Sequence, residues 1–215
     1  LYNRLGIQNL LVKVNSLGCA ESRKQYQKEL LSFLKPHFDQ LSPESKIRFE
    51  KNPLRILDSK DPKEQALLEK AATILDFLTA ESKEHFKALC DLLKDSSIPF
   101  EIDSKLVRGL DYYNKTVFEI VSDGLGAQNS IGGGGRYDGL LADLGGPDLP
   151  LIGHSTGIER ILLTMESQKL SFPKPPSPFV CFIPIGEKGQ KLCHNFLYDL
   201  RPVSYTHLTL PTTPY

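Results

Sequence analysis

Three short blocks rich in arginine, tyrosine and glycine contain the residues best suited to bind an anionic substrate. In order along the chain they read Leu106-Val-Arg-Gly-Leu-Asp-Tyr-Tyr113, Gly132-Gly-Gly-Gly-Arg-Tyr-Asp-Gly-Leu140 and Gly157-Ile-Glu-Arg160. A guanidinium group stabilises negative charge on phosphate and carboxylate oxygens, and a tyrosine offers a hydroxyl on a rigid apolar body. Packing alone does not account for this density and order.

The first block centres on Arg108, which stands directly before Gly109. Because glycine has no side chain, the backbone there can approach a ligand closely, and the fixed guanidinium can stabilise charge that builds on phosphate oxygens. The alternative is an ion pair between Arg108 and Asp111 across a turn, an interaction that often contributes little. Within the full block we favour the catalytic interpretation.

Tyr112 and Tyr113 close the first block. In strand geometry adjacent side chains face opposite ways, so we expect at most one of the two rings to point straight into a shared pocket. A tyrosine in such a pocket can bind a polar ring and seal it from water. For at least one of them, the alternative is a core tyrosine with a satisfied hydroxyl.

The second block is not a common phosphate loop, because no Lys-Ser/Thr follows its glycines and the spacing does not fit G-x-G-x-x-G. Gly132–Gly135 instead predicts a strand whose bare backbone can receive a small substrate, with a glycine-rich hairpin as the alternative. In the third block, Arg160 lies near the start of a helix predicted over Ile158–Met165. A helix N-terminus also favours anions.

A strand and a helical subdomain precede the three blocks. The stretch Ile7–Val14 mixes an apolar run with alternation and predicts a strand. Apolar residues at helical spacing then predict three helices: Ala20–Phe38, Asp61–Leu78 and Thr79–Leu93. Thr79 is a suitable N-cap for the last of them. Residues 20–97 therefore read as a small, mostly helical unit.

Strands return after this unit, and a further domain follows. Alternation over Pro99–Asp103 and β-branched residues over Thr116–Val121 predict neighbouring strands, antiparallel because their connection is short. Four prolines predict a linker over residues 171–178. Beyond it, Phe179–Ile185 and a helix over Gln190–Arg201 read as the first β-α unit of another domain.

Composition excludes several classes of protein. Lys+Arg and Asp+Glu both total 26, so the net charge is zero and a surface for nucleic acid has to be local. The four cysteines form no C-x-x-C pair, which favours a reducing cytosolic compartment over a disulfide framework. No apolar run is long enough for a membrane span. No metal site emerges either, since Cys193-His194 has no partner pair.

The ends of the chain indicate an internal piece of a longer reading frame. Residue 1 is leucine, and the only methionine is Met165. Residues 202–215 have neither helical nor strand periodicity and resemble a translated sequencing-library adapter, so we expect a non-native tail there. A disordered Thr/Pro tail is the alternative.

The three blocks resemble the histidine-binding and ATP-binding motifs of histidyl-tRNA synthetase, a class II aminoacyl-tRNA synthetase. The stretch Asn52-Pro-Leu-Arg-Ile-Leu-Asp-Ser-Lys60 and the order of elements are similar too. The resemblance implies an α+β fold, with a class II antiparallel sheet, flanking helices and a helical insertion. It implies this division of the chain: catalytic core 1–19 and 98–170, insertion 20–97, linker 171–178, and the start of an α/β anticodon-binding domain 179–201.

The same resemblance implies the activity of a histidine–tRNA ligase, the ATP-dependent activation of L-histidine and its transfer to tRNA(His). It makes Arg108 the catalytic residue. The implied histidine-binding residues are Arg108, Tyr112, Tyr113, Gly134 and Tyr137, with Tyr113 as our choice for the imidazole. The implied ATP-binding residues are Gly157, Glu159 and Arg160, and Mg²⁺ accompanies ATP. A cytoplasmic homodimer is implied as well.

Several points depart from the family or leave an alternative open. His154 stands where an apolar or aromatic residue is usual, and we expect a hydrogen-bonded structural histidine. The first and second class II motifs are absent from the chain, so we expect the fragment alone to be inactive. Basic residues of the insertion could contact tRNA phosphates, although a solvated face is the default: Arg23, Lys24, Lys46, Arg48 and Lys51.

A non-catalytic paralogue is the rival interpretation. It would be the regulatory subunit that partners ATP phosphoribosyltransferase, and a stress-kinase regulatory domain is more distant. Such paralogues tend to lose the catalytic arginine and to lack the insertion and the anticodon domain. Arg108, Arg160 and the insertion are all present here, which favours the enzyme.

Overall fold

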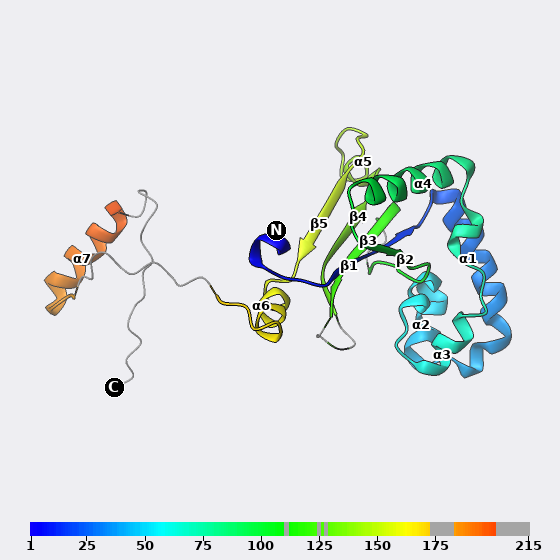
Figure 1. Ribbon diagram of the computed structural model, residues 1–215, viewed down its shortest axis with the longest axis horizontal. Helices are drawn as coiled ribbons and strands as arrows, with labels where there is room; N and C mark the ends of the chain where they lie inside the picture. The colour runs from blue at the N-terminus through cyan, green and yellow to red at the C-terminus, as the bar shows by residue number, and fades with distance from the viewer. Residues whose placement is uncertain (110–111, 124–125, 127–128, 173–182, 201–215) are drawn as a thin grey trace. The chain divides into compact units, whose positions relative to one another are not determined.

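The computed structural model describes residues 1–109, 112–123, 126, 129–172 and 183–200. The chain divides into two compact units, Leu1–Ser171 and Phe172–Tyr215. The first unit holds a five-stranded sheet and a group of helices (Figure 1). None of the helices in the described part of the chain is long and apolar enough to cross a membrane.

The sheet has the strand order β2-β1-β3-β4-β5. Its strands have these bounds: β1 Leu10–Ser16, β2 Phe100–Ile102, β3 Asn114–Ser122, β4 Ser130–Arg136 and β5 Ile152–Thr156. The pairs β1–β3, β3–β4 and β4–β5 are antiparallel, whereas β1 and β2 are parallel. The sheet is therefore mixed, with a predominantly antiparallel body.

The predicted pairing of the strands that became β2 and β3 is wrong. β1 lies between them and pairs with both, with Val14 opposite Ile102 on one side and Phe118 on the other. The connecting residues 103–113 are long enough to pass one strand. β1 ends in fully buried residues, including Val14 at 2% exposure and Asn15 at 0%, so the central position suits it.

The helical unit is built from seven helical segments, of which α2, α3 and α4 begin at a side-chain cap. They have these bounds: α1 Ala20–Leu34, η2 Lys35–Gln40, α2 Pro43–Lys51, η3 Pro53–Asp58, α3 Pro62–Leu68, η4 Ile74–Phe77 and α4 Ala80–Asp95. The Thr79 side chain accepts from the Ser82 N–H, which confirms the predicted N-cap. The helix expected over Asp61–Leu78 is instead α3 followed by η4. A capping box between Thr73 and Asp76 starts this second turn afresh.

One apolar cluster joins this helical unit to the sheet. It contains Tyr26 and Leu30 from α1, Ile56 from η3, and Tyr113 and Val117 at the start of β3. Tyr26, Leu30, Ile56 and Val117 are all at most 1% exposed. The segment before β3, which carries the first block, therefore rests on the insertion as well as on the sheet.

Two smaller clusters cover other parts of the sheet. α4 packs Phe86 and Cys90 against Val14 of β1, and Figure 1 shows this helix lying along the sheet. α6, Ile158–Ser167, packs Ile161 and Met165 against Ile7. Two short helices complete the unit: η1 Tyr2–Leu5 and α5 Leu140–Asp143.

A buried carboxylate ties the insertion together. Glu64 is 2% exposed and accepts hydrogen bonds from the Ser42 N–H at 2.6 Å, from the Ser45 hydroxyl at 2.7 Å and from the Ser59 hydroxyl. Burial by itself raises the pKa of this carboxyl, but the donated hydrogen bonds outweigh it and the pKa is lowered. Glu64 thus joins the starts of α2 and α3 as a carboxylate.

The second unit contains α7, Gly186–Leu200, which begins before the predicted Gln190. The predicted strand Phe179–Ile185 lies outside the described residues up to 182, and residues 183–185 have neither strand nor helix. Most of the predicted linker and the whole tail 202–215 also lie outside them.

Candidate active site

The glycines of β4 present a bare surface on one face of the sheet. A Cβ on Gly133 would lie 2.8 Å from Arg108 Nη1 and 2.8 Å from the Phe118 carbonyl oxygen. A Cβ on Gly135 would lie 2.9 Å from the Tyr113 ring. The two side chains thus occupy the space that side chains of β4 would otherwise fill.

The alternate glycines of β4 face the opposite way. A Cβ on Gly134 would meet the Gly153 carbonyl oxygen and lie 2.7 Å from His154 Cα. Gly134 is the residue that the sequence assigns to the histidine pocket. The absence of a side chain at Gly134, however, makes room for β5. Gly133 and Gly135 are the glycines that leave the sheet without side chains on the face that Arg108 covers.

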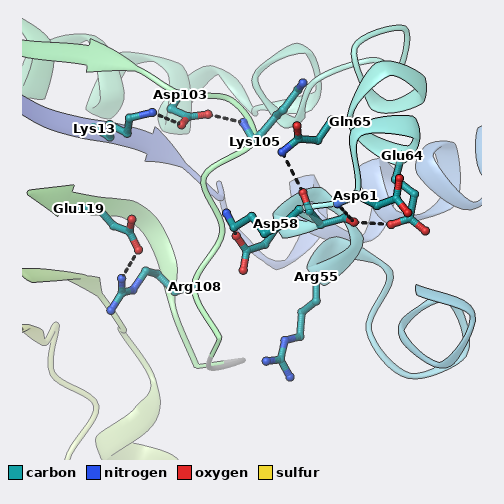
Figure 2. A network of polar contacts seen from close by, with 12 residues as sticks. Lys13, Arg55, Asp58, Asp61, Glu64, Gln65, Asp103, Lys105, Arg108 and Glu119 are labelled. Carbon is teal, nitrogen blue, oxygen red and sulfur yellow. Dashed lines mark hydrogen bonds and ion pairs between the residues drawn. The ribbon is translucent and has the colours of Figure 1, made fainter. Parts of the chain in front are cut away.

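Arg108 is held by an acid that the sequence analysis did not name. Its Nη1 lies 2.6 Å from Glu119 Oε1, and the two side chains are 22% and 25% exposed (Figure 2). Asp111, the alternative partner considered above, lies outside the described residues. The available signal was a lone glutamate in the middle of Thr116-Val-Phe-Glu-Ile-Val121, on an otherwise apolar strand.

One donor of Arg108 remains unused. The Arg108 Nε is buried and has no hydrogen-bond partner among the residues that the structure describes. A buried donor without an acceptor is costly, and a substrate oxygen would remove that cost. The ion pair with Glu119 fixes the guanidinium, while this second edge is left for an acceptor.

Three tyrosine rings gather beside Arg108. The ring centroids of Tyr112 and Tyr113 are 4.7 Å apart, and those of Tyr112 and Tyr137 are 5.3 Å apart. Tyr112 and Tyr113 precede β3, so strand alternation does not set the directions of their rings. Tyr113 is 7% exposed and Tyr112 is 36% exposed, and the expectation that at most one of them points into a shared pocket stays a prediction. Desolvation is the largest cause that raises the pKa of the Tyr112 hydroxyl, and the hydrogen bond with Tyr113 is the second. The hydroxyl is therefore protonated at neutral pH.

Contacts with Arg23 and Gly153 hold two of these tyrosines in place. Arg23 of α1 donates from Nη1 to the Tyr113 carbonyl oxygen at 2.9 Å. Tyr137 lies over Gly153, where a Cβ would collide with its hydroxyl. The next residue, Asp138, accepts from Arg136 Nε at 2.7 Å, and its carbonyl oxygen accepts from the Asn114 amide. The Arg-Tyr-Asp sequence is thus clamped to the start of β3.

The third block lies at the start of α6. Gly157 is the N-cap, Glu159 is exposed in the first turn, and Arg160 donates from Nη1 to the Ser130 carbonyl oxygen at 2.9 Å. Both arginines of the predicted site therefore attach to β4, Arg108 over Gly133 and Arg160 at its first residue.

His154 differs from its predicted role as a hydrogen-bonded structural histidine. It is exposed on β5, on the face away from Arg108, and its ring has no hydrogen bond within the described part of the chain. It lines a cavity of about 400 Å³ together with Phe118 and His85 of α4. Burial lowers the pKa of His85, and the positive charge of Arg136 lowers it further.

Comparison with known proteins decides the family. The family model described as histidyl-tRNA synthetase matches residues 7–161, which include all three blocks and the insertion. The chain belongs to the histidyl-tRNA synthetase family. Its resemblance to that family, first inferred from the three blocks, is thereby confirmed.

Curated relatives agree with this assignment. The chain is 53% identical over 201 residues to the histidine–tRNA ligase of Protochlamydia amoebophila, covering 94% of this chain and 47% of the relative. It is 44% identical to the histidine–tRNA ligase of Desulforamulus reducens, covering 94% and 48%. The chain therefore spans about half the length of these curated relatives.

The solved structures give the fold. The apo histidyl-tRNA synthetase of S. aureus matches with a TM-score of 0.63 and 30% identity, over 97% of this chain and 52% of that one. The predicted class II synthetase fold, an α+β sheet with flanking helices, is confirmed. The one correction is the parallel β1–β2 pair described above.

Proposed function

We propose that this chain is part of a histidine–tRNA ligase, which activates L-histidine with ATP and transfers it to tRNA(His). The observation that carries the proposal is the placement of Arg108 on the bare backbone of Gly133, beside three clustered tyrosines. A fixed cation next to an aromatic pocket suits an amino acid whose carboxylate reacts with a phosphate.

In the proposed first step, a carboxylate oxygen of histidine attacks the α-phosphorus of ATP. The bond between the α-phosphorus and the oxygen that bridges to the β-phosphorus breaks, and pyrophosphate leaves with that oxygen. Negative charge increases on the α-phosphate oxygens. Arg108 stabilises that charge from a position fixed by Glu119, so no reorganisation is needed during the reaction. Its free Nε supplies a further donor for the carboxylate or the phosphate.

The tyrosines bind the histidine side chain in this proposal. Tyr113 is 7% exposed and is our choice for the imidazole, with Tyr137 at its edge and Tyr112 on the solvent side. A tyrosine hydroxyl can donate a hydrogen bond to a neutral imidazole nitrogen, and the rings exclude water from it. Gly134 contributes backbone alone.

The start of α6 binds ATP in this proposal, through Gly157, Glu159 and Arg160, with Mg²⁺ accompanying the nucleotide. The proposed partners are L-histidine, ATP and tRNA(His), in a homodimer located in the cytoplasm. These assignments rest on membership of the family. The chain itself spans about half the length of its curated relative.

A graft tests the proposal. Residues 7–161 of this chain replace the corresponding segment of the Protochlamydia amoebophila relative, and histidine-dependent exchange of pyrophosphate into ATP is measured. We expect exchange in the graft, and a loss of about 100-fold or more on Arg108→Gln. Lys87→Gln, an exposed substitution on α4, is the control and should leave exchange unchanged. A folded graft without exchange would refute the proposal.

A further inference from the structure

A second cavity lies where the insertion meets the segment that carries Arg108. Its volume is about 360 Å³, and it is lined by α1, by the α2–η3 connection and by residues of the first block. Five of its lining residues are cationic: Arg23, Lys24, Lys51, Arg55 and Arg108. Among the residues that the structure describes, the lining contains no aspartate or glutamate.

The charge around this cavity is not balanced locally, although the chain as a whole has zero net charge. Lys24, Lys51 and Arg55 have no ion-pair partner among the residues that the structure describes. Two other cations of the insertion have carboxylate partners, Arg48 on Glu44 and Lys60 on Asp58. Five cationic side chains therefore line one hollow, and their combined charge favours an anion there.

Arg55 is held in place by the segment around it. The η3 turn buries its other side chains, with Ile56 at 0% and Leu57 at 6% exposure, and only Arg55 and Asp58 are exposed. A Cβ on Gly109 would lie 3.5 Å from Arg55 Nη2, so this guanidinium lies beside the first block. Figure 2 shows Arg55 extending from η3 with no contact to the other residues drawn.

We propose that this cavity binds a chain of condensed phosphates, either free as di- or triphosphate or as the tail of a nucleotide. Lys24, Lys51 and Arg55 are its main ligands. A compact anion fits better than a polynucleotide, because these cations line one hollow of about 360 Å³ and do not form an extended track along the surface. Binding of the phosphate chain to this cavity does not depend on the proposed function. Arg108 also lines the cavity, so competition between the phosphate chain and the substrates of the proposed ligase reaction does depend on it.

The test is calorimetric titration of the 215-residue chain with sodium triphosphate, with ATP and with adenosine. We expect triphosphate to bind, adenosine not to bind, and Arg55→Gln and Lys51→Gln each to weaken triphosphate binding by about tenfold. Lys28→Gln, an exposed lysine of α1 outside the lining, is the matched control and should have little effect. Circular dichroism checks that each variant is folded. If ATP binds more tightly than triphosphate and Arg55→Gln weakens both, the ligand is a nucleotide tail.

Several outcomes would overturn the proposal. One is the absence of triphosphate binding, and another is equal weakening by Lys28→Gln, which would indicate non-specific attraction. Weakening by Arg160→Gln but not by Arg55→Gln would place the anion at the start of α6. An oligouridine without terminal phosphates that binds more tightly than triphosphate, and is weakened by Arg55→Gln, would assign the cavity to a polynucleotide. Failure of the graft to exchange pyrophosphate would refute the ligase proposal and leave this result unaffected.

Discussion

Glu119 of β3 lies 2.6 Å from the guanidinium of Arg108, and this ion pair sets the orientation of the arginine over β4. We expect Glu119→Gln in the graft to lower the rate constant of exchange by about 10- to 100-fold, because one charged hydrogen bond is weakened. The KM for histidine should change less than the rate constant if Glu119 acts by positioning Arg108. Glu119→Asp should recover part of the rate.

The matched control for that experiment is Glu101→Gln. Glu101 also pairs with a cation, Lys13 at 2.9 Å, but it lies on β2 away from the site. Equal losses in the Glu101 and Glu119 variants would show that the effect is general destabilisation and would remove Glu119 from the mechanism.

The bare surface of β4 predicts a severe effect of a single methyl group. In Gly133→Ala the new Cβ would lie 2.8 Å from both Arg108 Nη1 and the Phe118 carbonyl oxygen. The backbone oxygen cannot rotate away, so we expect the free energy of unfolding to fall by about 1–3 kcal/mol. Urea denaturation of the 215-residue chain measures it. Gly189→Ala, in α7, has its nearest neighbours at 3.7 Å and should be tolerated.

Glu64 predicts an acid-sensitive insertion. Its folded-state pKa is lowered, so its contribution to stability is present above the unfolded-state pKa and is lost as pH falls through the folded value. We expect Glu64→Gln to cost about 2 kcal/mol at pH 7, and the difference from the parent protein to shrink in acid. Glu69→Gln, at an exposed pair with Lys105, is the control. A cost that is independent of pH would contradict the assignment.

The cysteines should differ in reactivity. Hydrogen bonds from Ser22, the backbone N–H first, lower the pKa of the Cys19 thiol, whereas burial raises that of Cys90. Because the thiolate is the nucleophile, iodoacetamide at neutral pH should modify Cys19 well before Cys90. Peptide mass spectrometry follows the two sites, and in urea their rates should converge. Faster labelling of Cys90 in the folded protein would contradict this.

Local patterns in the sequence predicted much of the fold. Alternation identified the strands around Val14 and Val117, and the capping residue Thr79 fixed the start of α4. The pairing of β2 with β1 was missed, because the side-chain pattern of a strand of only three residues is too short to indicate which strand it pairs with. The break between α3 and η4 depended on the Thr73–Asp76 capping box, which overrode the helical spacing of apolar residues.

The sequence motifs and the family resemblance predicted which residues lie together at the candidate site. Arg108, Tyr113 and Tyr137 were named from the sequence, and the structure brings them together. Glu119 was missed because its partner is eleven residues away along the chain and is reached only through the sheet. The alternation rule does not apply to Tyr112 and Tyr113, because they lie just outside the strand.

The apolar cluster shared by α1, η3 and the start of β3 limits how this protein can be re-engineered. Tyr26 and Leu30 pack in the same cluster as Tyr113, and Arg23 holds the Tyr113 backbone. Swapping residues 20–97 for the insertion of a distant relative would therefore change the support beneath the Tyr113 ring, which we propose to bind histidine. The insertion cannot be exchanged on its own, and a change at its contacts with Tyr113 requires a compensating change around Tyr113.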